Sequence, residues 1–301
     1  MMDAESARIL RKIIIDLICI CCAGFPVLFF FLFGDPYKRG FFCDDESLRH
    51  PFHPSTVTNV MLYCVGLCLP ICLMILIEYI HYRQEDHHVI RKFMNYSINS
   101  WIWRSYCVIG VFGFGAACNQ FLTDVAKYTI GRLRPHFYEV CNPHLNPETK
   151  IDCSLSKYKN EYIEDFICMN SDQRLVRETR LSFVSGHSSF SAYTMIYLML
   201  YLQARFTWKG SHLVKHLLQM ICFLLAWVTA LSRISDYKHH WSDVLAGSIL
   251  GSIIAIVMVL FVSDLVPKRT NRKNSQVQSG WDMQDMATRN AGVNSNNGPT
   301  V

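Results

Sequence analysis

The sequence of 301 residues lacks a strong excess of either charge, because its net charge is only +5 and its basic residues are scattered among acidic ones. Proteins that bind nucleic acid usually gather lysine and arginine into a patch or stripe. The 13 cysteines also lack the Cys/His ligand spacing that is typical of zinc sites. We therefore expect no nucleic-acid partner, no metal site and no cofactor.

Apolar residues are abundant instead, and they are concentrated in long runs. They make up 51% of the chain, and a membrane-spanning helix needs about 20 mostly apolar residues. Six segments approach that length, namely residues 13–33, 57–80, 106–126, 188–206, 213–231 and 244–266. We predict an all-α, multi-pass membrane protein with six transmembrane helices in a single domain, residues 13–266.

The charges at the ends of these segments predict how the chain crosses the membrane. Lysine and arginine precede the first segment, lie between the second and third, and follow the sixth, and such residues favour the cytosolic side. Residues 1–12 would then be a cytosolic N-terminus. Residues 267–301 are rich in Asn, Gln and Ser and would form a disordered cytosolic tail. The long loop from about residue 127 to residue 187 would face the extracellular space or an organelle lumen.

Some predicted spans contain polar residues, which are costly in lipid. We expect them to face the interior of the bundle and to form hydrogen bonds between helices, which is a structural role. These residues include Asp16, Asn119, Asp124 and Gln203.

Four cysteines, Cys43, Cys141, Cys153 and Cys168, lie in polar loops, whereas the other nine lie in or beside apolar segments. On the non-cytosolic side these four are able to form disulfides. Four cysteines allow three connectivities, so the pairing stays open. Cys141 and Cys153 are the candidate pair, because they are close in sequence and would close a short loop.

The first cluster of polar residues follows the third segment and includes Lys127, Arg134 and Pro135. Lys127 and Arg134 are seven residues apart, which places them on one face of a helix, and Pro135 should end that helix. Two cations on one face near the membrane boundary suit a phosphate dianion. The alternative is that both side chains only anchor the helix end.

The second cluster, Ser185-Gly186-His187, comes directly before the fourth segment. Gly186 allows the backbone to approach a ligand closely, and N–H groups at a helix N-terminus bind phosphate. His187 could donate a proton to a leaving oxygen. Alternatively, Ser185 is simply a helix cap.

The third cluster lies before the sixth segment and contains Arg233, His239 and Asp243. The four-residue spacing lets Asp243 accept a hydrogen bond from one nitrogen of His239, so that the other nitrogen can act as a nucleophile. Arg233 can bind phosphate through two N–H groups. The alternative is a His–Asp contact on the surface of a polar loop.

On the predicted topology the three clusters lie on the same side of the membrane, and together they resemble a known family. The pattern Lys-x6-Arg-Pro, Ser-Gly-His and Ser-Arg-x5-His-x3-Asp resembles that of the type 2 phosphatidic acid phosphatase superfamily, in particular the animal lipid phosphate phosphatases of the wunen type. Residues 39–47 and 201–208 resemble the same subgroup. Val184 departs from the wider superfamily, which has proline before Ser-Gly-His.

The resemblance implies that His239 becomes a phosphohistidine, oriented by Asp243, while His187 protonates the lipid oxygen that leaves. The groups that would bind the phosphate oxygens, in place of a metal, are Lys127, Arg134, Arg233 and the backbone of Ser185 and Gly186. The implied substrates are phosphatidate, lysophosphatidate, ceramide 1-phosphate and sphingosine 1-phosphate in the extracellular or luminal leaflet. The implied roles are in phospholipid metabolism and lipid signalling, with the plasma membrane as the expected location and ER and Golgi membranes as the alternative. The resemblance also implies that homo-oligomers can form.

Two other functions fit the residues less well. A lipid phosphotransferase would use the same groups but pass the phosphoryl-bearing group to an alcohol instead of water. A non-catalytic membrane protein that binds lipid or transports a solute would use the cations alone. That second function does not explain why His239 and Asp243 lie four residues apart beside Arg233.

Overall fold

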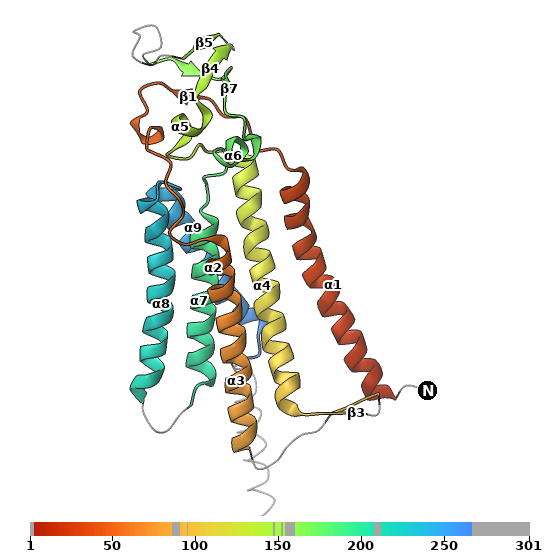
Figure 1. The fold of residues 1–301 in the computed structure, drawn as a ribbon. Helices are drawn as coiled ribbons and strands as arrows, with labels where there is room; N and C mark the ends of the chain where they lie inside the picture. Colours follow the sequence, from red (N-terminus) through yellow and green to blue (C-terminus); the bar gives the residue numbers. More distant parts are fainter. Residues whose placement is uncertain are drawn as a thin grey trace, which may run out of the picture. The chain divides into compact units, whose positions relative to one another are not determined.

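The computed structural model describes residues 3–85, 91–94, 96–146, 148–151, 153, 160–207 and 212–266. These residues fold mainly into helices that run side by side, with short strands confined to the loops (Figure 1). The long helices are α1 (Ala4–Phe33), α3 (Leu69–Gln84), α4 (Ser100–Ile130), α7 (Gly186–Arg205), α8 (His212–Ser235) and α9 (Trp241–Val257). The shorter ones are α2 (Asn59–Tyr63), α5 (Phe137–Cys141), α6 (Gln173–Glu178), the 3-10 turn η1 (Glu46–Leu48) and the π-helical turns η2 (Cys64–Cys68) and η4 (Met258–Val262).

The N-terminal end of the chain, from residue 3, lies within the described residues, whereas most of the C-terminal end lies outside them. The chain divides into two units, Met1–Leu265 and Val266–Val301. The predicted tail, residues 267–301, lies outside the described residues. At the other end, α1 begins at Ala4, so the helix already starts within the predicted N-terminal segment 1–12.

Five helical runs of the described chain are long and apolar enough to cross a membrane: α1, the run Asn59–Gln84 that joins α2 to α3, α4, α8, and the run Trp241–Val262 that joins α9 to η4. They coincide with five of the six predicted segments. The remaining segment, 188–206, forms α7, which has 20 residues but is less apolar than the others.

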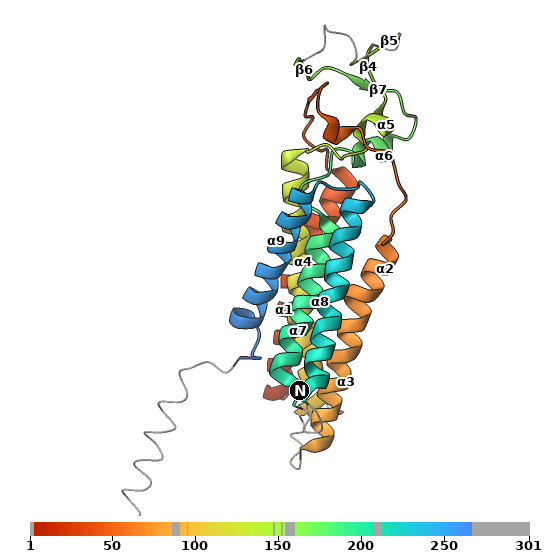
Figure 2. The same ribbon diagram turned by 90° about the vertical axis from the view of Figure 1, so that its left-hand side faces the viewer.

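The polarity of α7 has a physical reason, because this helix occupies the centre of the bundle (Figure 2). It packs against α9, α8, α4 and α3, and twelve of its residues are buried. Hydroxyl groups along it find partners inside the protein: Thr123 of α4 and Ser189 share a hydrogen bond of 2.9 Å, and Tyr193 donates to the backbone oxygen of Phe112 at 2.7 Å. A helix that is covered by other helices needs little lipid-facing apolar surface.

Most of the polar residues in the predicted spans form the expected hydrogen bonds between helices. Asp124 is the exception, because its Oδ1 accepts a hydrogen bond of 3.0 Å from Gln120 in the same helix. The three bonds between helices, with the donor first, are Tyr106–Asp16 at 2.8 Å, Ser189–Asn119 at 3.0 Å and Gln219–Gln203 at 3.3 Å.

Two glycines in α9 allow it to approach α7 closely. A Cβ atom on Gly251 would lie only 2.1 Å from the backbone oxygen of Ser189, and one on Gly247 would lie 2.5 Å from the backbone oxygen of Ser185. Small residues four apart are typical of membrane helices whose backbones touch. This contact brings the beginnings of α7 and α9 together, and the second and third sequence clusters lie there.

The loops at one end of the helices are joined by short antiparallel strands. Strand β1 (Phe41–Phe42) pairs with β6 (Tyr162–Ile163), and β4 (Pro143–Asn146) pairs with both β5 (Thr149–Lys150) and β7 (Ile167–Cys168). The hairpin of β2 (Arg91–Phe93) and β3 (Tyr96–Ile98) lies between α3 and α4, toward the opposite end (Figure 1). The first group of strands surrounds a small apolar core that includes Phe41, Leu48 and Phe137.

The predicted disulfide between Cys141 and Cys153 is wrong. Cys141 pairs with Cys168, and Cys153 pairs with Cys43. The strands explain both bonds: the β4–β7 ladder sets Cys168 opposite Pro143, two residues after Cys141, and the β1–β6 ladder holds the first loop, with Cys43, against the long loop.

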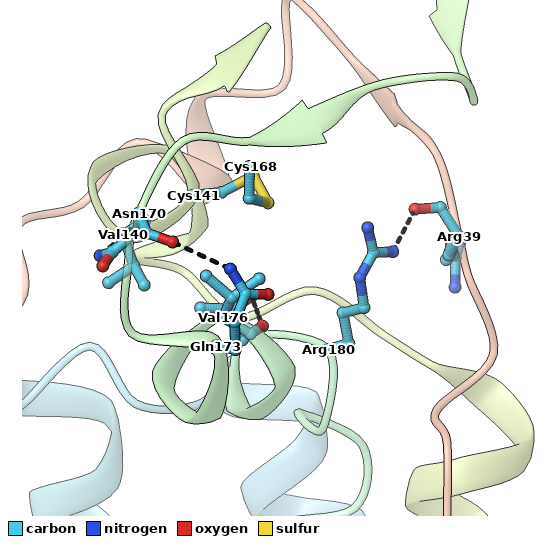
Figure 3. The surroundings of a disulfide bond; sticks show 9 residues. Arg39, Val140, Cys141, Cys168, Asn170, Gln173, Val176 and Arg180 are labelled. Atoms are coloured by element: carbon cyan, nitrogen blue, oxygen red, sulfur yellow. Dashed lines mark hydrogen bonds between the residues drawn. A yellow bond between two sulfur atoms is a disulfide. The ribbon is translucent and has the colours of Figure 1, made fainter. Parts of the chain in front are cut away.

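Hydrogen bonds support the chain around the Cys141–Cys168 bond (Figure 3). Asn170 donates to the backbone oxygen of Val140 at 2.9 Å, and Arg180 donates to the backbone oxygen of Arg39 at 3.1 Å. The second bond again links the first loop to the long loop. The strands, disulfides and these contacts therefore hold the two loops together above the ends of the helices.

Candidate active site

The three sequence clusters come together at the loop end of the helices. Lys127 lies in the last turn of α4, Ser185 is the N-cap of α7, Arg233 is in the last turn of α8, and Asp243 is in the first turn of α9. One cavity of about 680 Å³ is lined by Lys127, Arg134, Gly186, His187, Arg233 and His239. Ser185 and Asp243 are fully buried and do not line it.

The prediction that Lys127 and Arg134 share one face of a helix that ends at Pro135 is wrong. Helix α4 ends at Ile130, because Gly131 follows it in the left-handed conformation with φ of 58°. Arg134 therefore lies beyond the helix, where its backbone N–H donates to the backbone oxygen of Thr179 at 2.7 Å. Both side chains nevertheless line the same cavity.

The walls of this cavity have two characters. One wall carries the cations and histidines just named. The other is formed largely by apolar residues of α1 and α2, among them Val27, Leu28, Phe31 and Leu62. A ligand with an anionic head and an apolar body would match both walls.

His239, the candidate nucleophile, lines the cavity. Its side chain is 4% exposed, and its Nδ1 donates a hydrogen bond of 2.7 Å to the backbone oxygen of Ser182. A carbonyl oxygen can only accept, so in the neutral ring the proton is on Nδ1 and the lone pair is on Nε2. Burial, reinforced by the cations Arg134 and Lys127, holds the pKa of His239 well below its usual value. The imidazole is therefore neutral at physiological pH, as a nucleophile must be.

Asp243 lies differently from the prediction. Its Oδ2 is 3.9 Å from Nδ1 of His239, which is too far for a hydrogen bond. The carboxylate instead accepts hydrogen bonds from Arg132 at 2.5 Å and from the hydroxyl of Ser182 at 2.6 Å. It thereby holds the residue whose backbone oxygen orients His239, so its effect on the histidine is indirect.

The reason for this difference is where the helix begins. His240 is the N-cap of α9, and Asp243 accepts a hydrogen bond of 3.1 Å from its backbone N–H in a capping box. His239 precedes the cap and is therefore outside the helix. A four-residue spacing brings two side chains together only when both residues are helical.

The Ser-Gly-His cluster begins α7, and two of its residues serve the helix start. The Ser185 hydroxyl accepts from the backbone N–H and the hydroxyl of Ser188, at 3.4 and 2.9 Å, so the capping interpretation of Ser185 is confirmed. A Cβ atom on Gly186 would lie 3.0 Å from Nζ of Lys127, so this glycine leaves room for the lysine. His187 Nε2 is buried without a hydrogen-bond partner among the described residues. It is available for a ligand.

Arg233 is held rigidly at the cavity wall. It is 1% exposed, and its guanidinium donates to Asp236 at 2.9 Å and to the hydroxyl of Ser55 at 3.3 Å. Asp236 in turn accepts from the backbone N–H and the hydroxyl of Thr56, at 2.8 and 2.7 Å. These contacts fix the segment before α2 to the end of α8.

Sequence reasoning missed Lys238 and Arg132, and both adjoin residues that it singled out. Lys238 lines the cavity directly before His239, and its ammonium lies 3.7 Å from the centre of the Phe52 ring. Arg132 is two residues before Arg134 and forms the ion pair with Asp243. A short search for extra cations beside the motifs would have found both.

The pH dependence of substrate capture should report on Lys238. Burial, together with repulsion from Arg134 and Arg233, lowers the pKa of Lys238 to about 8. The lysine is charged below this pH and loses its charge as the pH rises, so kcat/KM for an anionic substrate should fall above pH 8. Lys238→Arg keeps its charge throughout this range.

The check is a kcat/KM profile between about pH 7 and pH 9.5 for the wild type and Lys238→Arg. The fall above pH 8 should be absent or much weaker in the arginine variant. Identical slopes in the two proteins would show that another group titrates.

Comparison with known proteins identifies the family to which this sequence is related. The model of the PAP2 superfamily matches residues 109–267, which include all three clusters. A Drosophila melanogaster protein that carries the provisional name of a phosphatidate phosphatase is 50% identical over 93% of this chain and 74% of its own. Phospholipid phosphatase 1 of Rattus norvegicus is 40% identical over 93% of this chain and 95% of its own. Phospholipid phosphatase 2 of Mus musculus is 39% identical over 85% and 88%, respectively.

No solved structure matches the chain significantly. The family assignment therefore depends on sequence, and the family model covers more than half of the chain. The relatives extend the similarity to α1 and the first loop, which precede the matched residues. The chain thus belongs to the PAP2 superfamily.

Proposed function

We propose that this protein is a lipid phosphate phosphatase that hydrolyses the phosphomonoester of membrane lipids. The observation that carries the proposal is the buried, neutral His239, whose Nε2 has no hydrogen-bond partner among the described residues, in a cavity that has one cationic and one largely apolar wall. Relatives named as phospholipid phosphatases and as a phosphatidate phosphatase support the same class of reaction.

In the first step, Nε2 of His239 attacks phosphorus while the bond from phosphorus to the lipid oxygen breaks. The products are a phosphohistidine and a lipid alcohol. His187 enters this step as the imidazolium, which the phosphate dianion bound beside it would stabilise, and its Nε2 proton passes to the oxygen of the lipid alcohol. In the second step, a water molecule gives a proton back to His187 and attacks phosphorus, the bond from phosphorus to Nε2 of His239 breaks, and inorganic phosphate leaves. The cations that spread the charge on the phosphate oxygens in both steps are Lys127, Arg134, Arg233 and Lys238.

The apolar wall defines the class of substrate. Phosphatidate, lysophosphatidate, ceramide 1-phosphate and sphingosine 1-phosphate each combine a phosphomonoester with long apolar chains. With the phosphate at the cations, these chains would lie along α1 and α2, whose side chains line the cavity. Such a lipid would enter from the bilayer rather than from water.

The proposed topology has six spans, with α7 as the central one, and places both termini in the cytosol. The Cys43–Cys153 bond supports it, because this bond joins loops separated by two spans and needs an oxidising compartment. The site would then face the extracellular or luminal leaflet, in the plasma membrane or in ER and Golgi membranes. Residues 267–301 would be a disordered cytosolic tail.

The test is the release of inorganic phosphate from phosphatidate by the purified protein in detergent with excess chelator. We expect many turnovers per protein molecule, because the cations would stabilise the negative charge on the phosphate oxygens, as a metal ion does in many phosphatases. Transfer of the phosphoryl-bearing group to an added alcohol, without free phosphate, would instead identify a lipid phosphotransferase. No turnover by the folded protein would favour non-catalytic lipid binding or transport.

A further inference from the structure

Asp124 lines the cavity, but the proposed phosphatase mechanism does not use it. It lies in α4 three residues before Lys127. Gln120, one helical turn before Asp124, lines the same cavity. Asp124 is 8% exposed. Its Oδ1 accepts from Gln120 at 3.0 Å, whereas no described residue donates a hydrogen bond to its Oδ2.

The position of Asp124 along the helix decides which part of a ligand it meets. Three residues of α-helix span about 4.5 Å, so Asp124 is that much further from the loop end of α4 than Lys127. With the phosphate held by Lys127 and attacked by His239, the carbons next to the ester oxygen would lie at the depth of Asp124. Asn59 and Tyr63 line the same cavity, and Tyr63 is close enough to Asp124 to be affected by its charge.

A carboxylate at this depth would be stabilised by a hydrogen-bond donor on the ligand. The charge of Lys127 attracts this carboxylate, but no described residue forms a hydrogen bond to its Oδ2. A buried ionised oxygen that lacks a hydrogen bond costs free energy, which a donor on the ligand would recover. The phosphate itself is an anion and would be repelled. The donor must therefore come from the lipid backbone beside the phosphate, and a cationic donor would gain most.

We propose that Asp124 binds a hydrogen-bond donor, best an ammonium group, on the carbon next to the one that carries the phosphate. The inference depends on the proposed function and adds a preference to it. Sphingosine 1-phosphate has an ammonium group at that carbon, whereas phosphatidate has an ester oxygen, which accepts hydrogen bonds but cannot donate. The enzyme should therefore discriminate in favour of amino-lipid phosphates.

The experiment compares kcat/KM for sphingosine 1-phosphate and phosphatidate, each at the same surface fraction in detergent micelles. Asp124→Asn keeps the size of the side chain and an oxygen for Gln120 but removes the charge. We expect about a tenfold loss for sphingosine 1-phosphate, as for a lost charge-assisted hydrogen bond, and little change for phosphatidate. Asp16→Asn is the matched control, because Asp16 is a carboxylate in α1 that bonds Tyr106 and does not line the cavity.

The two proposals can fail separately. Equal losses for both lipids in Asp124→Asn would mean that Asp124 only balances the nearby cations, and this would overturn the inference while phosphatase activity stands. A wild-type protein that releases phosphate from neither lipid would overturn the proposed function itself. An unchanged ratio in Asp16→Asn together with a tenfold change in Asp124→Asn would support the inference.

Discussion

Replacement of His239 by alanine is expected to reduce phosphate release from phosphatidate by about a thousandfold or more, through kcat. The change removes the nitrogen that would carry the phosphoryl group, and none of the neighbouring cations can replace it as a nucleophile. Substrate binding should suffer little, because the cations and the apolar wall of the cavity remain. The effect therefore belongs to the chemical step.

Two measurements make this prediction sharp. Steady-state kinetics should show the loss in kcat, and rapid denaturation during turnover of a labelled substrate should trap a labelled phosphoprotein only in the wild type. His216→Ala is the matched control, since His216 is exposed in α8 and bonds only Gln219 among the described residues. A His239→Ala protein that retains wild-type kcat would refute the proposed mechanism.

The second large effect concerns stability. Gly251→Ala adds a methyl group 2.1 Å from the backbone oxygen of Ser189 and 2.8 Å from the backbone nitrogen of Tyr193. Neither atom can move without its helix, so α7 and α9 must separate. We expect the folded state to lose about 3 kcal/mol, seen as a lower Tm in detergent. Activity should fall as well, because the beginnings of these helices hold His187 and Asp243.

Gly110→Ala is the control for this change. Gly110 is also in a long helix, α4, but a Cβ atom there has no neighbour within 4 Å. Helix propensity alone favours alanine over glycine by about 1 kcal/mol in a helix interior, so this variant should be as stable as the wild type or more so. Equal Tm values for the two variants would contradict close packing at Gly251.

Sequence patterns predicted the helices well, for a simple physical reason. Long apolar runs can satisfy their backbone groups in lipid only as helices, so five segments were recognisable as spans from composition alone. The segment that forms α7 was also located, although its serines and tyrosines made it less apolar. What composition could not reveal is that α7 is the central helix, because that depends on which neighbours cover it.

The site was predictable in its membership but not in its connections. Each motif falls at a helix end, and the topology collects those ends, so the histidines and three cations were expected at one place. The bond from His239 to Ser182 was not predictable, because it joins residues 57 apart in the chain through a backbone oxygen. The predicted cysteine pairing was wrong for the same reason. Strand pairing, and not distance along the sequence, decides which cysteines meet. The catalytic roles themselves remain predictions.

The Cys43–Cys153 bond also has a consequence for biosynthesis. Cys43 leaves the ribosome 110 residues before its partner, so it must stay reduced while two further helices are synthesised and inserted. Cys141 and Cys168 are only 27 residues apart, and no membrane helix has to be inserted between their synthesis. A chain in which one of the two intervening helices failed to insert would leave Cys43 and Cys153 on opposite sides of the bilayer. Formation of the long-range bond thus marks the molecules in which the two segments between these cysteines, 57–80 and 106–126, were both inserted.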